Sequence, residues 1–228
     1  MGKDGKGNVL RVTVTPTDIR QSYGIVNKFY GLQEGTFEKG LRQRGLEFLA
    51  VKESEIILKI GAGAGFSLRE IARWVGVTGK VHGTDITSEM LKRTEKRLRK
   101  AGLQERLVLT KGDARAMPYQ DNMFDTMYMT ATLELFDTPD IPRVLGEIKR
   151  VLKPGGRLVV ASLSKEGRES FWFVSLYEWL HRKFPKYASC RLIYVEQAIK
   201  NTGFNITRSE ECMIVRLVPM RLVLARPR

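Results

Sequence analysis

Short apolar stretches alternate with amphipathic segments along most of the chain after residue 50. The stretches of strand length are EIILKI, KVHGTDI, RLVLTKG, FDTMYMT and GRLVVASL, and helical spacing of apolar residues falls between them at 67–75, 88–101 and 141–152. Strands that alternate with helices predict a doubly wound α/β fold, in which a mostly parallel sheet carries helices on both faces. GRLVVASL is apolar almost throughout, as expected of a strand that is buried on both sides.

The pattern differs before this region. Thr17 and Asp18 can cap a helix that runs to about Tyr30, and an apolar stripe predicts a second helix at 34–50. Residues 1–16 are rich in Gly and Lys, and we expect them to form a flexible leader.

The pattern also changes after the alternating region. Residues 168–184 have helical periodicity and many aromatic side chains, and a last helix is predicted at 195–202, where Gly203 ends it. The segments 204–209 and 213–225 are expected to be two final strands.

The composition is that of a soluble globular protein, with 43% hydrophobic and 28% charged residues. Residues 17–228 contain no internal repeat and no linker rich in Pro, Gly or Ser, so we expect them to form one domain. The sequence has no apolar run of about 18 residues and no apolar signal-peptide core. Cys190 and Cys212 do not have metal-site spacing, so we expect no metal site and a cytoplasmic location.

The charge balance is unusual, because 39 Lys and Arg against 25 Asp and Glu give a net charge of +14. Such an excess can attract nucleic acid, anionic lipid or an anionic substrate, or it can serve solubility alone. The basic residues are dispersed, with the densest group at 92–100, and the sequence has no basic low-complexity tail. Nucleic acid is therefore a disfavoured partner.

The segment IILKIGAGAGFSLREIA places three glycines between a predicted strand and a predicted helix: Gly61, Gly63 and Gly65. Glycines there let the backbone turn sharply and approach a ligand closely. A ligand would then lie at the carboxyl end of the first strand, against a helix N-terminus. A plain tight turn would also explain three glycines at this position.

Two acidic residues at neighbouring strand ends favour a ligand. Asp85 ends the second strand about 20 residues after the last glycine, where a carboxylate can accept hydrogen bonds from both ribose hydroxyls of an adenosine cofactor. Asp85 could instead cap the next helix, although Thr87 and Ser88 suit that role better. Asp113, in the segment GDARAMPY after the third strand, could accept from the adenine amino group.

These residues resemble class I S-adenosylmethionine-dependent methyltransferases, and the similarity extends from about Tyr23 to Phe204. The segment FDTMYMTATLELFDTPDIPRVLGEIKRVLKPGGRLVV is similar to the family's fourth strand, the following helix and its LKPGG turn. Within the superfamily, the sequence is most similar to the branch that includes ubiquinone and menaquinone biosynthesis methyltransferases. The resemblance implies a Rossmann-like, mostly parallel seven-stranded sheet with an antiparallel C-terminal strand.

The resemblance also implies S-adenosylmethionine as cofactor, S-adenosylhomocysteine as product, and a helical lid at 17–50. YGIVNKFYGL resembles the lid of that branch, although a core role for its tyrosines is equally open. The residues that the resemblance places around the cofactor are Tyr23, Tyr30, Lys59, Gly61, Ala62, Gly63, Gly65, Asp85, Ile86, Met90, Gly112, Asp113, Ala114 and Thr130.

Three positions depart from the family pattern by lacking a carboxylate. Gly24 and Gly31 stand where the family often has Asp, and Lys59 stands where it usually has an acid. The cofactor carries a sulfonium and an ammonium, so a Lys59 side chain that faces the pocket would oppose it. Two unit charges about 5 Å apart cost roughly 3 kcal/mol at an effective dielectric constant of about 20. Lys59 could instead point outward or be less ionised.

Dinucleotide binding is the rival interpretation of a glycine loop followed by an acid. GAGAG lacks the spacing GxGxxG, and neither GDA nor LKPGG has a role in a hydride-transfer site. We therefore favour the methyltransferase interpretation.

Methyl transfer from a sulfonium depends mainly on alignment, so a dedicated base is not always required. Candidate bases are Glu134, Asp137, Tyr128 and the more distant His181, although Glu134 and Asp137 are commonly structural at such positions. The sequence has no Asn/Asp-Pro-Pro-Tyr/Phe motif, which disfavours a typical amino-directed nucleic-acid base methyltransferase.

The aromatic helix lies in a predicted substrate-side insertion at 165–190. Its side chains could line an apolar pocket with Arg182 and Lys183 near anionic headgroups, or they could pack on the sheet. We favour C- or O-methylation of a small or lipophilic quinone or phenol, with phospholipid or small-amine N-methylation as the alternative. Peripheral contact with an anionic membrane would suit both. A catalytically silent S-adenosylmethionine-binding regulatory protein and an RNA-directed methyltransferase also remain open.

Overall fold

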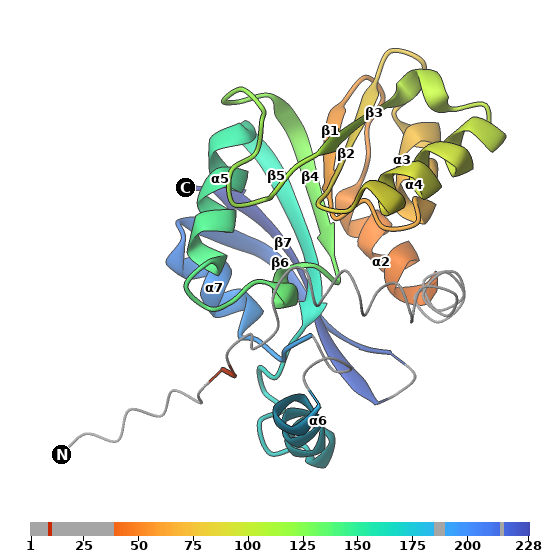
Figure 1. Cartoon of the computed structure of the whole chain (residues 1–228). Helices are drawn as coiled ribbons and strands as arrows, with labels where there is room; N and C mark the ends of the chain where they lie inside the picture. Colours follow the sequence, from red (N-terminus) through yellow and green to blue (C-terminus); the bar gives the residue numbers. More distant parts are fainter. Residues whose placement is uncertain (1–8, 11–38, 185–189, 215–216) are drawn as a thin grey trace.

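The computed structural model describes residues 9–10, 39–184, 190–214 and 217–228. Its centre is one seven-stranded sheet in the order β3-β2-β1-β4-β5-β7-β6 (Figure 1). The strands are β1 (Ile56–Ile60), β2 (Lys80–Asp85), β3 (Leu107–Lys111), β4 (Phe124–Thr130), β5 (Leu152–Leu163), β6 (Phe204–Ile214) and β7 (Val218–Pro227). The strands β1 to β5 pair in parallel, whereas β7 is antiparallel to both β5 and β6. The predicted doubly wound, mostly parallel sheet with an antiparallel C-terminal strand is therefore confirmed.

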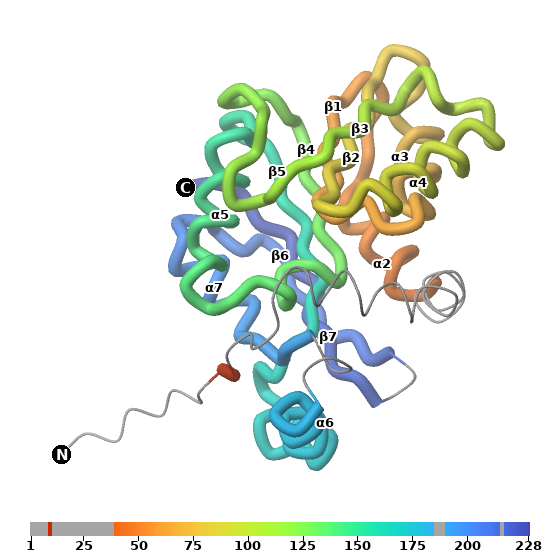
Figure 2. Tube along the Cα trace, viewed as in Figure 1, coloured from red at the N-terminus to blue at the C-terminus, as the bar shows by residue number. Residues whose placement is uncertain are grey.

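Helices cover both faces of the sheet (Figure 1). The helices are α2 (Lys39–Leu49), α3 (Phe66–Trp74), α4 (Ser88–Lys100), α5 (Ile141–Val151), α6 (Trp172–Lys183) and α7 (Val195–Asn201). Short 3₁₀ turns occur at Gln104–Arg106 and Leu133–Leu135. The helices α2, α3 and α4 lie on one face and α5 and α7 on the other, while the trace in Figure 2 shows α6 beyond the end of the sheet.

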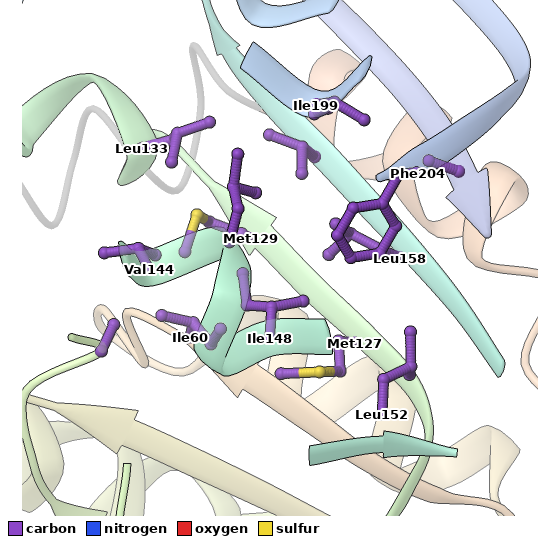
Figure 3. Packing of buried hydrophobic residues seen from close by; sticks show 14 of the residues in the cluster. Ile60, Met127, Met129, Leu133, Val144, Ile148, Leu152, Leu158, Ile199 and Phe204 are labelled. Carbon is purple, nitrogen blue, oxygen red and sulfur yellow. The ribbon is translucent and has the colours of Figure 1, made fainter. Parts of the chain in front are cut away.

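The two faces bury separate apolar clusters, because side chains alternate along each strand. On β4, Met127 and Met129 pack toward α5, and Tyr128 between them packs toward α2. Figure 3 shows Met127 and Met129 among the side chains of α5 and β5, close to Leu158. The central strands are thus held from both sides, which fixes the positions of their carboxyl ends.

A buried ion pair fastens α2 to the sheet. Arg157 of β5 donates to the carbonyl oxygens of Leu49 (2.7 Å) and Ala50 (2.8 Å) at the end of α2. Its Nη1 and Nη2 atoms donate to the two carboxylate oxygens of Glu55 at 2.7 and 2.8 Å, so Nη2 serves both Ala50 O and Glu55, and both side chains are nearly buried. Arg157 therefore satisfies carbonyl groups that the helix end leaves without intrahelical partners.

The predicted strands and helices between 55 and 203 are present, with differences at three places. LKPGG was expected to be a turn but lies within β5, where Gly155 has φ +75° and a register shift accommodates the extra residues. The aromatic helix begins at Trp172 rather than at 168, because the preceding residues form turns. The first of the two final strands extends to Ile214 instead of 209, and the second begins at Val218 instead of 213 and ends at Pro227. The two strands pair with each other from Phe204–Pro227 to Ile214–Val218.

Most of the predicted leader, and the predicted helix at 17–30, lie outside the described residues. Two residues of the leader are described, and both contact the domain. Val9 packs against the cluster on the α5 face, and the carbonyl oxygen of Leu10 accepts a hydrogen bond from buried Arg191 at 2.8 Å. At these two residues the chain is attached to the fold rather than loose.

Candidate functional site

The candidate site lies where the order of the strands reverses. β1 is flanked by β2 on one side and β4 on the other, and their carboxyl ends are in register, with Ile60 opposite both Thr84 and Met129. The chain leaves β1 and β4 toward helices on opposite faces of the sheet. In open α/β sheets, ligands bind in the crevice outside such a switch point.

The glycine loop between β1 and α3 requires glycine for its conformation. Gly61, Gly63 and Gly65 have φ of +70°, +57° and +81°, which side-chain-bearing residues rarely adopt. A Cβ on Gly61 would overlap the hydroxyl of Thr132, and one on Gly65 would lie 2.9 Å from the Cα of Thr94. The loop is therefore more than a plain tight turn, since neighbouring segments approach Gly61 and Gly65 too closely for a side chain at either position.

Every carbonyl of this loop from residue 61 to residue 64 accepts a hydrogen bond from within the protein. Lys59 Nζ donates to Gly61 O at 2.8 Å, and the Gly65 amide donates to Ala62 O at 3.3 Å. From α4, Thr94 donates to Gly63 O at 3.0 Å, and Arg97 Nε donates to Ala64 O at 2.6 Å. The loop is thus held in shape before any ligand arrives.

The residues of α4 that hold the loop were missed by the sequence reasoning. Arg97 belongs to the densest basic group, at 92–100, yet its guanidinium stacks on the Phe66 ring at 3.4 Å while it binds the loop. Thr94 is fully buried one turn after Met90, which is also buried. Thr94 and Arg97 are three positions apart and so lie on the same side of α4, a spacing that could have identified both as loop contacts.

Asp85 lies at the end of β2 beside the glycine loop, as predicted. One carboxylate oxygen accepts from the Gly63 amide at 3.3 Å. The other accepts from the amide and the hydroxyl of Thr87 at 2.9 and 2.7 Å. A carboxylate has about four acceptor sites, so Asp85 retains capacity for a further donor. Thr87, rather than Asp85, is the N-cap residue of α4.

Lys59 points into the protein, so an outward-pointing side chain is ruled out. The residue is 3% exposed, and its ammonium donates to Gly61 O and to the Thr130 hydroxyl at 2.8 and 3.0 Å. The same nitrogen lies 5.2 Å from the centre of the Tyr128 ring. The side chain is on the same face of the sheet as Ile57, beneath α2, and therefore reaches the carboxyl end of β1 from inside.

Asp113 lies after β3 and is held by an arginine that the sequence analysis did not identify. Arg115 contacts both carboxylate oxygens of Asp113, the shortest contact being 2.7 Å, and also binds Asp140 at 2.8 Å. The hydrogen bond from Arg115 keeps the pKa of Asp113 below its usual value. Asp113 is therefore an ionised acceptor whose orientation is fixed, next to buried Ala114 and to Gly112, whose amide binds Asp85 O at 3.2 Å.

The four candidate bases differ in their surroundings. Glu134 is fully buried and accepts from the Ser162 hydroxyl at 2.6 Å, and Tyr128 is buried against Gly45 of α2. Asp137 lies 3.9 Å from Arg191, and His181 is buried on α6, which Figure 2 shows away from α3 and α4.

The remaining predicted residues differ in how far they are described. Met90 is 7% exposed, whereas Ile86 is 38% exposed. Tyr23 and Tyr30 lie outside the described residues, and so do the lid positions around them.

Comparison with known proteins finds methyltransferases that are similar to this chain. Residues 57–156 match the family described as "Methyltransferase domain". A demethylmenaquinone methyltransferase of Lactobacillus johnsonii is 34% identical over 65% of this chain and 59% of its own length. A ubiquinone/menaquinone biosynthesis C-methyltransferase of Saccharophagus degradans is 30% identical over 71% of this chain and 63% of its own length. The chain thus matches about three fifths of the length of these curated relatives.

Solved structures share the fold at lower identity. A SAM-dependent methyltransferase from Aquifex aeolicus has a TM-score of 0.61 and 23% identity, and the match covers 93% of this chain and 99% of that one. The [4+2]-cyclase SpnF has a TM-score of 0.65 and 20% identity, with coverage of 82% and 79%. A fold that also occurs in a cyclase does not define a reaction by itself. Residues 57–156 therefore match a methyltransferase domain, and the chain is similar in sequence to ubiquinone and menaquinone biosynthesis methyltransferases; its glycine loop and strand order agree with this similarity.

Proposed function

We propose that the chain transfers a methyl group from S-adenosylmethionine to carbon or oxygen of a lipophilic quinone or phenol. The arrangement of the glycine loop and Asp85 at the switch point carries this proposal, because it suits an adenosyl nucleoside. The similarity to demethylmenaquinone and ubiquinone/menaquinone methyltransferases supports the choice of acceptor.

The residues present fit the nucleoside part of this cofactor. The glycine loop turns with positive φ at the carboxyl end of β1, where a nucleoside would lie, and Asp85 can accept from ribose hydroxyls. Asp113 is ionised and can accept from an adenine amino group. We assign the lining of the pocket to these residues and to Ile86, Met90, Gly112, Ala114 and Thr130.

The cofactor supplies an electrophilic methyl carbon and a neutral thioether leaving group. The protein's contribution is then to fix the acceptor in line with that methyl carbon. Glu134 supports this role indirectly, because it is fully buried and holds the Ser162 hydroxyl and the Leu163 amide at the end of β5. We assign Glu134 as a positioning residue and none of the four candidates as a required base.

We further propose that α6 brings the chain to an anionic membrane surface, where lipophilic acceptors reside. Trp172, Leu176 and Trp179 form one helical stripe and are 60%, 43% and 46% exposed. Exposed Arg182 and Lys183 follow at the end of the helix, on a chain of net charge +14. An apolar stripe next to basic residues suits the boundary between headgroups and acyl chains of anionic lipid.

The exposure of this stripe differs from both roles predicted for the aromatic helix, a pocket lining or packing on the sheet. On the inner side of α6, Val174 and His181 are buried, and the predicted packing of aromatic residues holds for Tyr177, which packs against the cluster on the α2 face. Among the described residues, no helix is long and apolar enough to cross a membrane. Contact through the α6 surface is the form of membrane association that the described helices support.

The reaction is tested with the full chain, S-adenosylmethionine labelled in the methyl group, and a panel of acceptors. The panel contains demethylated quinols, simple phenols, phosphatidylethanolamine, small amines and RNA, and products are identified by mass spectrometry. Labelled quinone or phenol is the expected result, and Asp85→Ala is expected to weaken cofactor binding and reduce turnover. Label only in an amine would instead favour the N-methyltransferase, and cofactor binding without any labelled product would favour a silent regulatory protein.

Membrane contact is tested by sedimentation with vesicles. We expect binding to phosphatidylglycerol/phosphatidylcholine vesicles and little binding to phosphatidylcholine alone. Trp172→Ser/Trp179→Ser should abolish binding, while Trp74→Ser on α3, where the ring is 45% exposed, should leave it unchanged. Equal binding by the two variants would contradict the α6 surface as the contact.

A further inference from the structure

The ammonium of Lys59 lies at the site where the glycine loop offers its first carbonyl. It donates to Gly61 O at 2.8 Å and is held from the other side by the Thr130 hydroxyl at 3.0 Å. The residue is 3% exposed, on the sheet face that α2 covers. The nitrogen of Lys59 is therefore fixed in position in the wall of the candidate site.

We propose that Lys59 is a specificity-determining residue that weakens the binding of S-adenosylmethionine and its product through their α-ammonium group, so that adenosyl ligands without this group bind more tightly. The ammonium of Lys59 takes the place of a ligand ammonium at Gly61 O. This inference rests on the proposed function, because it assumes that an adenosyl ligand binds along the glycine loop.

Two physical effects support this assignment. First, each of the four carbonyls from Gly61 to Ala64 already uses one of its two acceptor sites for an internal hydrogen bond, which halves the capacity of the loop for a ligand ammonium. Second, a ligand ammonium near the loop would be repelled by Lys59 and also by Arg97, whose guanidinium lies against Ala64 O. Two unit charges about 5 Å apart at an effective dielectric constant of about 20 correspond to roughly a hundredfold loss of affinity.

Lys59 is not easily displaced by such a ligand. Its side chain is enclosed by Tyr128, whose ring centre is 5.2 Å from Nζ, and by the covering helix α2. Moving the ammonium away would leave Gly61 O and Thr130 to find new partners and would place a charge among apolar neighbours. We therefore expect Lys59 to keep its position and a ligand that carries an ammonium group to bind more weakly.

The direct test compares three ligands on the wild-type chain by isothermal titration calorimetry. The ligands are S-adenosylhomocysteine, the analogue in which hydrogen replaces its α-amino group, and methylthioadenosine, which lacks the amino-acid part. We expect the deaminated analogue to bind at least as tightly as S-adenosylhomocysteine. Binding of S-adenosylhomocysteine tenfold or more tighter than the analogue would overturn the proposal.

Variants provide the second test. Lys59→Met should raise the affinity for S-adenosylhomocysteine by roughly ten- to a hundredfold while changing that for methylthioadenosine less than about threefold. Lys59→Arg, which keeps the charge, should retain the wild-type order of affinities. Lys100→Met, an exposed position at the end of α4, is the matched control for loss of a lysine and should change nothing.

The outcomes separate this inference from the function on which it rests. A chain that binds none of the three ligands overturns both. If the chain binds methylthioadenosine, the nucleoside site is supported. If the affinity for S-adenosylhomocysteine is then unchanged or lower in Lys59→Met, the role proposed for Lys59 is overturned. In the second case the lysine would be recruiting the ligand's carboxylate. If Lys59→Met does not fold, the comparison of ligands on the wild type decides alone.

Discussion

Replacing Gly61 with alanine should destabilise the fold at the candidate site through two separable effects. The φ of +70° is unfavourable for alanine by roughly 1–2 kcal/mol. The new Cβ would also overlap the Thr132 hydroxyl, and overpacking of this kind costs roughly 1–3 kcal/mol. We therefore expect Gly61→Ala to lower the free energy of unfolding by roughly 2–5 kcal/mol.

A double-mutant cycle separates the two effects. Thr132→Ala removes the hydroxyl that the new Cβ would meet, at the loss of its 2.8 Å hydrogen bond to Thr130 O, which is worth roughly 0.5–1.5 kcal/mol. In Gly61→Ala/Thr132→Ala only the backbone strain remains. The double variant should therefore be more stable than the sum of the single changes predicts, by roughly 1–3 kcal/mol.

Urea unfolding followed by far-ultraviolet circular dichroism measures all four free energies by linear extrapolation. A loss below about 0.5 kcal/mol for Gly61→Ala, which is the scatter of ordinary surface substitutions, would refute the reasoning about the loop. Strict additivity in the cycle would leave the backbone term intact but would refute the close approach of Thr132.

Three further predictions concern stability. Gly146 lies in the middle of α5, where a Cβ would meet nothing within 4 Å, so Gly146→Ala should raise the free energy of unfolding by roughly 0.5–1 kcal/mol in the same urea assay. A lower free energy of unfolding in this variant would contradict the open space around Gly146. Arg157→Met should lower it by roughly 3–5 kcal/mol, because Glu55 and the end of α2 lose their partner, and Glu55→Gln should be milder since it keeps one acceptor. Burial, and then the charge of Lys80, lower the pKa of His82 below 6.5, so below that pH the unfolded chain binds a proton that the folded chain does not. The melting temperature should therefore fall more steeply between pH 7 and 5.5 in the wild type than in His82→Leu, and parallel curves would exclude His82 as the cause.

Much of the fold could be predicted from the sequence, because the strands β1, β4 and β5 have apolar runs that only a doubly covered sheet can bury. The same is true of the glycine loop and of Asp85, since strand ends and positive-φ turns leave local signals in the sequence. The LKPGG segment was placed wrongly for a tertiary reason. Pairing with β4 extends through it by means of a register shift, which no local pattern records.

The partners that hold the candidate site could not be predicted in the same way. Arg97 and Arg115 resemble ordinary surface cations in the sequence, and their roles depend on Ala64 O and Asp113, which lie 33 and 2 positions away. The sequence also did not predict whether the Lys59 side chain points into the protein. Alternation along a strand shows which residues share a face of the sheet, but not which helices cover that face. The exposed stripe on α6 reverses the usual rule that aromatic residues of a helix face the core, so periodicity alone could not predict it.

The place of β7 in the sheet has a consequence for how the protein is made. β7 comes last of the seven strands along the chain, yet it lies between β5 and β6. While a ribosome is still synthesising residues 218–227, β5 has an open edge and β6 lacks its partner. Open edges of apolar strands are sites of aggregation in nascent and truncated chains. We therefore expect folding to be completed only after this strand has emerged, and chains that stop before residue 218 to depend on chaperones for solubility.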